Sequence, residues 1–465
     1  MSATLISTEI EKSNGQTPNV ATVAPLQKID RIVFLDCVRG MALLGILLMN
    51  SMAQSQSHVF YDSMNLDQPI TGPNFYVWIL ERGVFEGTMR GLFSILFGAG
   101  TFLLISRLVK SKEGMEPADF YFRRLLWLLF FGLVNAFIFL WPGDILYPYA
   151  LCGFLLFPFR NLSPKNLLIG ALLLLALGTY RQNMQLYEAR QTISKGQIAE
   201  KLQTNKQKLT DQQDEDLKEY QGFKESASSE GIMKKARVET KKVNSSNYLE
   251  MVKYYKDVNM KIQSVFFYNS WWDILLMFFV GMALLKSGFI EGRKQTALYA
   301  AIAVIGISIG ISLNYYQLKM EYSNKFNFFN IVQQQKFVLY DIRRFCQTLG
   351  YLSVLILLYK IISFRKVFLI FAPVGQMAFT NYLTQSIITS IIFYGFGWYG
   401  KLQRYEVYYV VVAIWVFQII ASNIWLRYFR FGPFEWLWRS LTYKTKQPML
   451  RPRKEVDTIA AVSMA

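Results

Sequence analysis

Long apolar runs are the feature that most constrains what this chain can fold into. Several runs are long enough to cross the roughly 30 Å hydrocarbon core of a bilayer as helices. Backbone groups in lipid must find hydrogen-bond partners within their own segment, which favours helices, and the runs are continuous rather than alternating as in membrane barrels. With 52% hydrophobic residues over 465 positions, the sequence predicts an all-α, polytopic membrane helix bundle.

The runs predict about ten transmembrane helices. Their expected ranges are 33–52, 91–108, 124–140, 145–159, 167–180, 271–285, 297–313, 344–362, 374–394 and 408–425. The predicted organisation is a disordered cytoplasmic tail (1–30), helices one to five (31–180), a polar helical insert (181–263), helices six to ten (264–442) and a second disordered tail (443–465).

The Lys and Arg residues predict the orientation. With ten spans, the basic connections all fall on one side, which the positive-inside rule makes cytoplasmic. Both termini are therefore expected inside and the 181–263 insert outside. The formal net charge is +18, but the basic residues are spread over the connections rather than forming a stripe. We therefore predict a lipid-bilayer partner and no nucleic acid.

The insert is dense in Lys, Glu, Asp and Gln. It also holds apolar residues at helical spacing, such as Tyr248, Met251 and Tyr255. This pattern favours two or three helices broken near residues 226–229. The alternative is a solvated, partly disordered linker.

The first span carries polar residues that lipid would not tolerate. Asp36 and Arg39 are three residues apart, so they can meet on one helix face. Asn50 follows Arg39 by eleven residues, about three helical turns, and therefore lies on the same face. Charges within a membrane helix usually face a partner or a wet cavity. The trio is therefore a candidate cavity lining, and the plainer alternative is an anchoring ion pair with a packing amide.

Further candidates lie near the expected external side. Arg90 precedes the second span and can bind an anion or simply extend to the interface. Asp144 and Asp273 can each act as a base or cap the helix that follows. His58, the single histidine, is a candidate general base, although a lone loop histidine is often only a surface residue.

The ninth span carries an amide stripe that predicts an inward-facing surface. Asn381 and Gln385 are four residues apart, so they form either packing contacts or a cavity wall. We find no spacing typical of a metal site, a P-loop or a dinucleotide fingerprint. We therefore predict no metal.

Several motifs together resemble the YeiB-like family of bacterial inner-membrane proteins, a domain of unknown function. The similar stretches are Leu35-Asp36 to Asn50, Phe93-Ser94 to Gly100, Arg123-Arg124 to Gly132, Gly143-Asp144 to Ala150, Gly375 to Ser386 and Gly432 to Arg439. The resemblance covers about residues 31–442 and implies a multi-pass protein of the bacterial inner (plasma) membrane.

That family is in turn similar to membrane acyltransferases of the OafA type and to heparan-glucosaminide N-acetyltransferase. The resemblance implies acyl-CoA as a donor. OafA-like enzymes carry a catalytic histidine where this chain has Asn50, and relatives often carry a histidine where it has Asn135. The heparan enzyme keeps the asparagine and uses a histidine in the next external segment, the region of His58.

Three functions remain open from the sequence. The first is transfer of an acyl group from a cytoplasmic donor to an extracytoplasmic glycan or lipid, with His58, Asp144 or Asp273 as the base. The second is transport of a small polar solute past Asp36 and Arg39. The third is a non-catalytic membrane module whose insert binds a partner.

Overall fold

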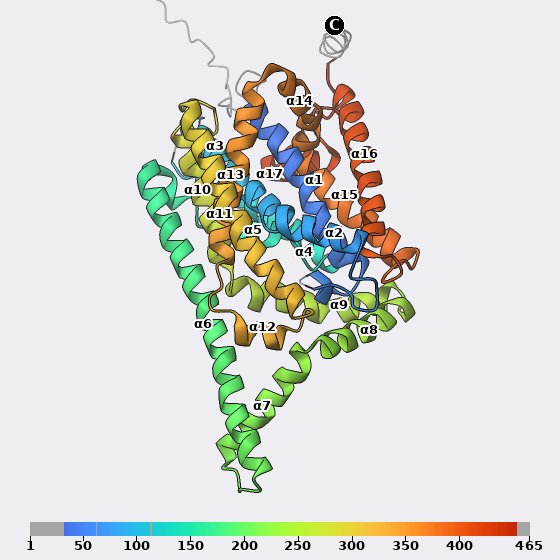
Figure 1. The fold of residues 1–465 in the computed structure, drawn as a ribbon. Helices are drawn as coiled ribbons and strands as arrows, with labels where there is room; N and C mark the ends of the chain where they lie inside the picture. The colour runs from blue at the N-terminus through green and yellow to red at the C-terminus, as the bar shows by residue number, and fades with distance from the viewer. Residues whose placement is uncertain (1–31, 62, 112–113, 453–465) are drawn as a thin grey trace, which may run out of the picture. The chain divides into compact units, whose positions relative to one another are not determined.

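The computed structural model describes residues 32–61, 63–111 and 114–452 (Figure 1). The first helices are α1 (Val33–Ser55), α2 (Pro73–Leu80), α3 (Thr88–Ser111), α4 (Glu116–Phe137), α5 (Leu146–Phe154) and α6 (Pro164–Thr204). Next come α7 (Asp211–Ala227), α8 (Ser229–Ser245), α9 (Tyr248–Lys261), α10 (Trp271–Lys286), α11 (Thr296–Ser323) and α12 (Phe328–Gln334). The last are α13 (Tyr340–Lys360), α14 (Ile362–Gln376), α15 (Ala378–Ser390), α16 (Arg404–Tyr428) and α17 (Pro433–Tyr443). Short 3₁₀ or π turns are η2 (His58–Tyr61), η3 (Glu81–Phe85), η4 (Pro158–Asn161), η5 (Ile262–Phe266) and η6 (Ile391–Gly395).

The predicted helical membrane bundle is confirmed. Six helical segments are long and apolar enough to cross a bilayer, and the number rises to eight if each of two bent pairs forms one span. Within the described residues the only β-structure is an isolated bridge between Phe429 and Leu450. The chain is therefore a multi-pass, all-helical membrane protein.

Among the described residues this number of spans falls short of the ten that the sequence predicts, and the predicted eighth span, α13, is not one of the qualifying segments. The stretch predicted as the fourth span forms α5, whose nine residues extend only about 14 Å, half of a hydrocarbon core. The predicted ninth span is not continuous, because α14 and α15 meet at Met377 with a bend of 75°. A second bend, of 62°, separates the α9–η5 segment from α10.

Helix α1 lies inside the bundle, whereas other spans face outward. In its most apolar window 78% of the residues are buried, against 17% for α6 and 22% for α11. An isolated helix facing lipid on all sides would carry no polar residues, so the enclosure of α1 explains how this helix keeps Asp36 and Arg39.

Glycines set the closest helix crossings. A Cβ at Gly40 of α1 would lie 2.3 Å from the carbonyl oxygen of Phe371 in α14, and one at Gly98 of α3 would lie 2.3 Å from that of Phe278 in α10. Without side chains at these points the backbones touch directly, which is how helices associate in lipid. Gly98, in the middle of the second predicted span, therefore lets α3 pack against α10.

The insert is helical and has buried clusters of its own. Figure 1 shows α6 continuing beyond its apolar half and α7 packing beside it (green). Leu186 and Ile193 of α6, Tyr220 of α7 and Val332 of α12 share one apolar cluster. Capping boxes begin α7 at Thr210 and α9 at Asn247, and the predicted break near 226–229 coincides with the α7–α8 junction.

The segment after α17 returns to the end of α16. The amide of Arg430 donates to the Met449 oxygen at 2.8 Å, and that of Arg451 to the Tyr428 oxygen at 3.0 Å. Residues 449–451, which the sequence places in the second tail, therefore pair with the chain. The first predicted tail and residues 453–465 lie outside the described residues.

Candidate functional site

The ten candidate residues fall into several separate groups, of which two lie toward opposite ends of α1. We call the end that contacts α8 and α9 the insert end, and the opposite end, near α17, the α17 end. Asp36 and Arg39 lie at the α17 end, and Asn50 lies eleven residues along the helix, about 16 Å away and half-buried. The trio therefore does not form a single cluster.

At the insert end, His58 forms a dyad with a residue that the sequence did not single out. The Nδ1 of His58 lies 3.0 Å from Oε2 of Glu239 in α8, and the imidazole side chain is 61% exposed. Glu239 is buried and also accepts hydrogen bonds from Ser57 Oγ at 2.5 Å and Tyr399 OH at 3.0 Å. An exposed histidine whose ring is oriented by a buried carboxylate is the arrangement of a general base.

The face of α8 explains how Glu239 reaches this place. Met233 and Ala236 pack against Phe60 of η2, and Val243 packs in a second cluster on the same helix face. Glu239 lies between these apolar residues, so docking of the helix carries the carboxylate inward. Burial opposes its ionisation, but His58 with the two hydroxyl donors outweighs burial and lowers the pKa of Glu239 below 4.5.

Arg90 and Asp273 also meet, on α3 and α10. Arg90 Nη2 donates to Asp273 Oδ2 at 2.9 Å, and the other Asp273 oxygen pairs with Arg344 of α13. Arg344 is almost fully buried, whereas the Arg90 side chain is 39% exposed. A carboxylate between two guanidinium groups fixes the positions of both arginines.

Further buried ion pairs surround this group. They are Glu81–Arg404, Glu86–Arg343, Glu86–Arg82 and Arg82–Glu321. They tie η3 to α11, α13 and α16, and η3 is a π turn, an element that often occurs at functional sites. Charged residues buried inside a membrane helix bundle often mark a functional region.

At the α17 end, three arginines gather around the start of α1. Arg39 Nη1 donates to Asp36 Oδ1 at 3.0 Å, as their spacing predicts. Arg124 of α4 stacks on the Trp438 ring at 3.6 Å, and Arg439 lies 4.4 Å from the Phe431 ring. Arg124 interacts electrostatically with both Arg39 and Arg439. This end therefore carries concentrated positive charge.

Asn135 and Asp144 are brought together inside the fold. Asn135 Nδ2 donates to Asp144 Oδ1 at 2.8 Å, and Asp144 Oδ2 accepts from the backbone of Tyr147 at 2.8 Å in the first turn of α5. Tyr382 OH lies 3.4 Å from Asp144 Oδ1. Asp144 is 4% exposed, so it caps α5 and links α4 to α15.

The amide stripe of α15 packs against α16. Gln385 Nε2 donates to Gln418 Oε1 at 2.9 Å, and Gln418 Nε2 donates to the backbone carbonyl oxygen of Asn381 at 2.8 Å. Asn381 Nδ2 donates to Ser422 Oγ at 2.9 Å. These buried bonds join two helices, so the stripe uses its hydrogen bonds for packing.

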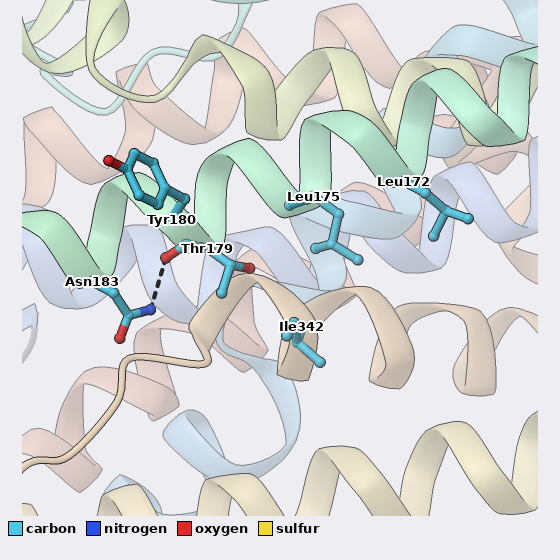
Figure 2. A pocket seen from close by; sticks show the side chains of 7 residues that line it. Leu172, Leu175, Thr179, Tyr180, Asn183 and Ile342 are labelled. Carbon is cyan, nitrogen blue, oxygen red and sulfur yellow. Dashed lines mark hydrogen bonds between the residues drawn. The ribbon is translucent and has the colours of Figure 1, made fainter.

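A groove of about 470 Å³ lies between α6 and α13 (Figure 2). Its lining is Leu172, Leu175, Ala176, Thr179, Tyr180, Asn183 and Ile342. The leucines belong to the outward-facing span, and the polar residues stand where α6 turns hydrophilic. Asn183 Nδ2 donates to the Thr179 oxygen at 2.7 Å, a bond visible in Figure 2. The groove is therefore apolar along α6 and polar at one end.

The residues that sequence reasoning missed are those supplied from far along the chain. Glu239 is 181 positions from His58, in a polar helix where one more acid is unremarkable. The signal was its place among apolar residues of one α8 face. Arg404 and Glu435 had no such signal. Within the described ranges no three His, Cys, Asp or Glu side chains could together hold a metal ion.

Comparisons with known proteins relate the chain to one family and to uncharacterized bacterial proteins. Residues 284–445 match the family described as "Protein of unknown function (DUF418)". The chain is 30% identical to the uncharacterized protein YxaH of Bacillus subtilis (strain 168), with 94% of this chain and 100% of the relative covered. It is 28% identical to the uncharacterized protein YeiB of Escherichia coli (strain K12), over 91% and 99%. No solved structure matches.

Proposed function

The chain belongs to the DUF418 family, whose matched relatives are uncharacterized, and we propose that it is a membrane acyltransferase with His58 as general base. The observation that carries the proposal is the dyad, in which a buried Glu239 lies 3.0 Å from Nδ1 of a histidine that stays 61% exposed. Glu239 acts as a positioning residue, because its carboxylate fixes the tautomer that leaves Nε2 as the basic nitrogen.

The reaction follows from this geometry. An acceptor hydroxyl gives its proton to the imidazole as its oxygen attacks the acyl carbonyl of a thioester. The carbon–sulfur bond then breaks, and the leaving thiolate takes the proton back from the imidazolium. The acceptor becomes an ester and the donor a thiol, so the step needs neither an oxidant nor a metal.

Acyl-CoA is the donor that we propose, bound at the α17 end. The three arginines there, Arg39, Arg124 and Arg439, carry the charge that phosphates of such a donor require. The thioester arm of the donor extends from these arginines toward the dyad at the insert end, and the apolar α6–α13 groove supports binding of its acyl chain along the bundle. In this proposal both termini and α17 are cytoplasmic, while the insert and the dyad lie outside and meet a glycan or lipid hydroxyl.

Lipid and glycan profiling by mass spectrometry tests the proposal. A deletion strain is complemented with the wild type, His58→Ala, Glu239→Gln or Arg237→Ala. Loss of a general base lowers such rates by roughly 10²–10⁴-fold, so His58→Ala should lack an acylated product that the wild type restores. Glu239→Gln should show a smaller loss, since an amide still contacts the imidazole.

Arg237→Ala is the matched control. Arg237 lies on the same helix as Glu239, but its partner is the exposed carboxylate of Asp67, at 2.8 Å. This variant should restore the product fully. Identical acylation in the deletion and wild-type strains would overturn the enzyme proposal, and so would full restoration by His58→Ala.

Transport of a polar solute is the second candidate, favoured by a different observation. Two helix pairs are bent by 62° and 75°, and buried ion pairs such as Glu81–Arg404 lie near the π turn η3. Broken helices and buried charges at depth are the usual construction of substrate sites in transporters. Solute uptake by reconstituted vesicles with unchanged acylation profiles would favour this candidate over the first.

A further inference from the structure

Arg344 is a buried cation with unused hydrogen-bond donors. Its side chain is 2% exposed and pairs with Asp273 through Nη2. Its Nε and Nη1 have no hydrogen-bond partner among the described residues. Nearly all buried polar atoms in proteins are paired, and an exception usually marks a bound water or ion. For a guanidinium group, which only donates, the missing partner must be an acceptor, and an anion is the best one.

A second unpaired donor lies on the same face of α13. Thr348 follows Arg344 by four residues, so both face the first turn of α3. Its hydroxyl is fully buried and also lacks a partner within the described part of the chain. A Cβ at Gly91 would lie 2.5 Å from Thr348 Oγ1, and one at Gly87 would lie 2.5 Å from Arg344 Cδ. The two glycines therefore let the positive end of α3 approach these donors closely.

Arg90 connects this place with the surface. It shares Asp273 with Arg344, at 2.9 Å, and its side chain is 39% exposed. It also interacts electrostatically with Tyr61, which belongs to the same short helix η2 as His58. A ligand that reaches Arg90 from the insert end therefore lies beside the segment that carries the dyad.

We propose that Arg90, Arg344, Thr348 and the first turn of α3 bind a phosphate group. A phosphate offers several acceptor oxygens to the unpaired guanidinium nitrogens, the threonine hydroxyl and the helix end. If the protein is the acyltransferase proposed above, this site identifies its acceptor as a phosphorylated molecule, and only this part of the inference rests on the proposed function. The phosphate can belong to a lipid headgroup or to a soluble molecule, and these sources are separable.

Thermal unfolding of the purified full-length protein tests binding without reference to acyl transfer. The probes are inorganic phosphate, added to protein in a neutral detergent, and phosphatidylglycerol, compared with phosphatidylcholine in nanodiscs. We expect the unfolding midpoint to rise with at least one probe, since a ligand of the native state stabilises it. A rise with inorganic phosphate indicates a soluble source, and a rise confined to phosphatidylglycerol indicates a lipid headgroup.

Variants connect the rise to the site. Arg90→Gln and Thr348→Val should each weaken the apparent affinity, the former about tenfold or more because a charged donor is lost. Arg237→Gln removes the same charge from an exposed arginine and should leave the affinity unchanged. Thr348→Val conserves volume, so it remains informative if the arginine variant fails to fold. The proposal is overturned if neither probe raises the midpoint, or if both variants respond like the wild type.

The two proposals can fail separately. His58→Ala should keep the phosphate response, because His58 is not among the binding residues. A retained response with no acylated product in any strain removes the enzyme and keeps the anion site. An acylated product that depends on His58, together with no phosphate response, keeps the enzyme proposal and removes the anion site.

Discussion

The two ends of the bundle hold their arginines in different ways. At the insert end Arg404, Arg343 and Arg82 pair with buried carboxylates. At the α17 end Arg124 and Arg439 stack on aromatic rings. A buried ion pair fixes the positions of both charged partners, whereas stacking on an aromatic ring supports only the face of a guanidinium group. The insert end is therefore built for rigid positioning of its charged side chains, whereas two arginines of the α17 end are positioned by aromatic rings.

The largest effect should come from breaking a buried ion pair at the insert end. Arg404 and Glu81 have side chains only 3% and 2% exposed, and Arg404 Nη2 also donates to the Phe60 oxygen at 2.8 Å. Arg404→Met leaves an unpaired buried carboxylate, which costs about 3–5 kcal/mol in unfolding free energy. Denaturant unfolding in mixed micelles measures the loss.

A paired substitution sharpens this test. Because the cost arises from the unpaired charge, Arg404→Met combined with Glu81→Leu should recover much of the lost stability. A double variant as unstable as Arg404→Met alone would mean that the arginine acts through its bonds to the Phe60 and Ser63 carbonyls. In that case the contrast between the two ends would rest on loop anchoring rather than on ion pairing.

A smaller effect is expected at the α17 end, where the one buried carboxylate of α17 caps a helix. Glu435 accepts hydrogen bonds from the Phe379 amide at 2.7 Å, the Thr380 amide at 3.0 Å and the Thr380 hydroxyl at 2.5 Å. Glu435→Ala should cost about 2–3 kcal/mol, since three buried donors lose a charged acceptor. Denaturant unfolding measures it, with Glu435→Gln as the variant that keeps part of the cap. Equal losses for both would show that charge, rather than hydrogen bonding, carries the contact.

The fold was predictable where local pattern decides it. Apolar length predicts membrane helices such as α1 and α11, because a bilayer demands such a length of each segment separately. The prediction of a span failed at α5, because Trp141, Pro142 and Gly143 precede this apolar run and Pro158 follows the helix. These residues end helices, so a run of apolar residues became a nine-residue helix between turns.

The candidate site was predictable by residue type but not by partner. The Asp36–Arg39 contact follows from helical spacing alone. The Arg90–Asp273 and His58–Glu239 contacts join residues more than 180 positions apart, and nothing in the local sequence encodes them. The Arg90–Asp273 pair depends on the packing of α3 against α10, and the His58–Glu239 pair on that of the insert against η2. A single sequence reveals neither.

The smallest effect tests the dyad through pH, because protonation changes Glu239 without removing its side chain. Its pKa is lower in the folded protein than its usual 4.5, so the associated stability is present above the unfolded value. That stability is lost as the pH falls through the lower folded value. Wild-type protein should therefore lose more stability between neutral and acid pH than Glu239→Gln, which has no proton to gain. Thermal midpoints measured across pH 3 to 7 would show the difference as a narrowing gap. Parallel curves would mean that Glu239 does not rely on its charge, and the rigid positioning assigned to the insert end would then lack its electrostatic basis.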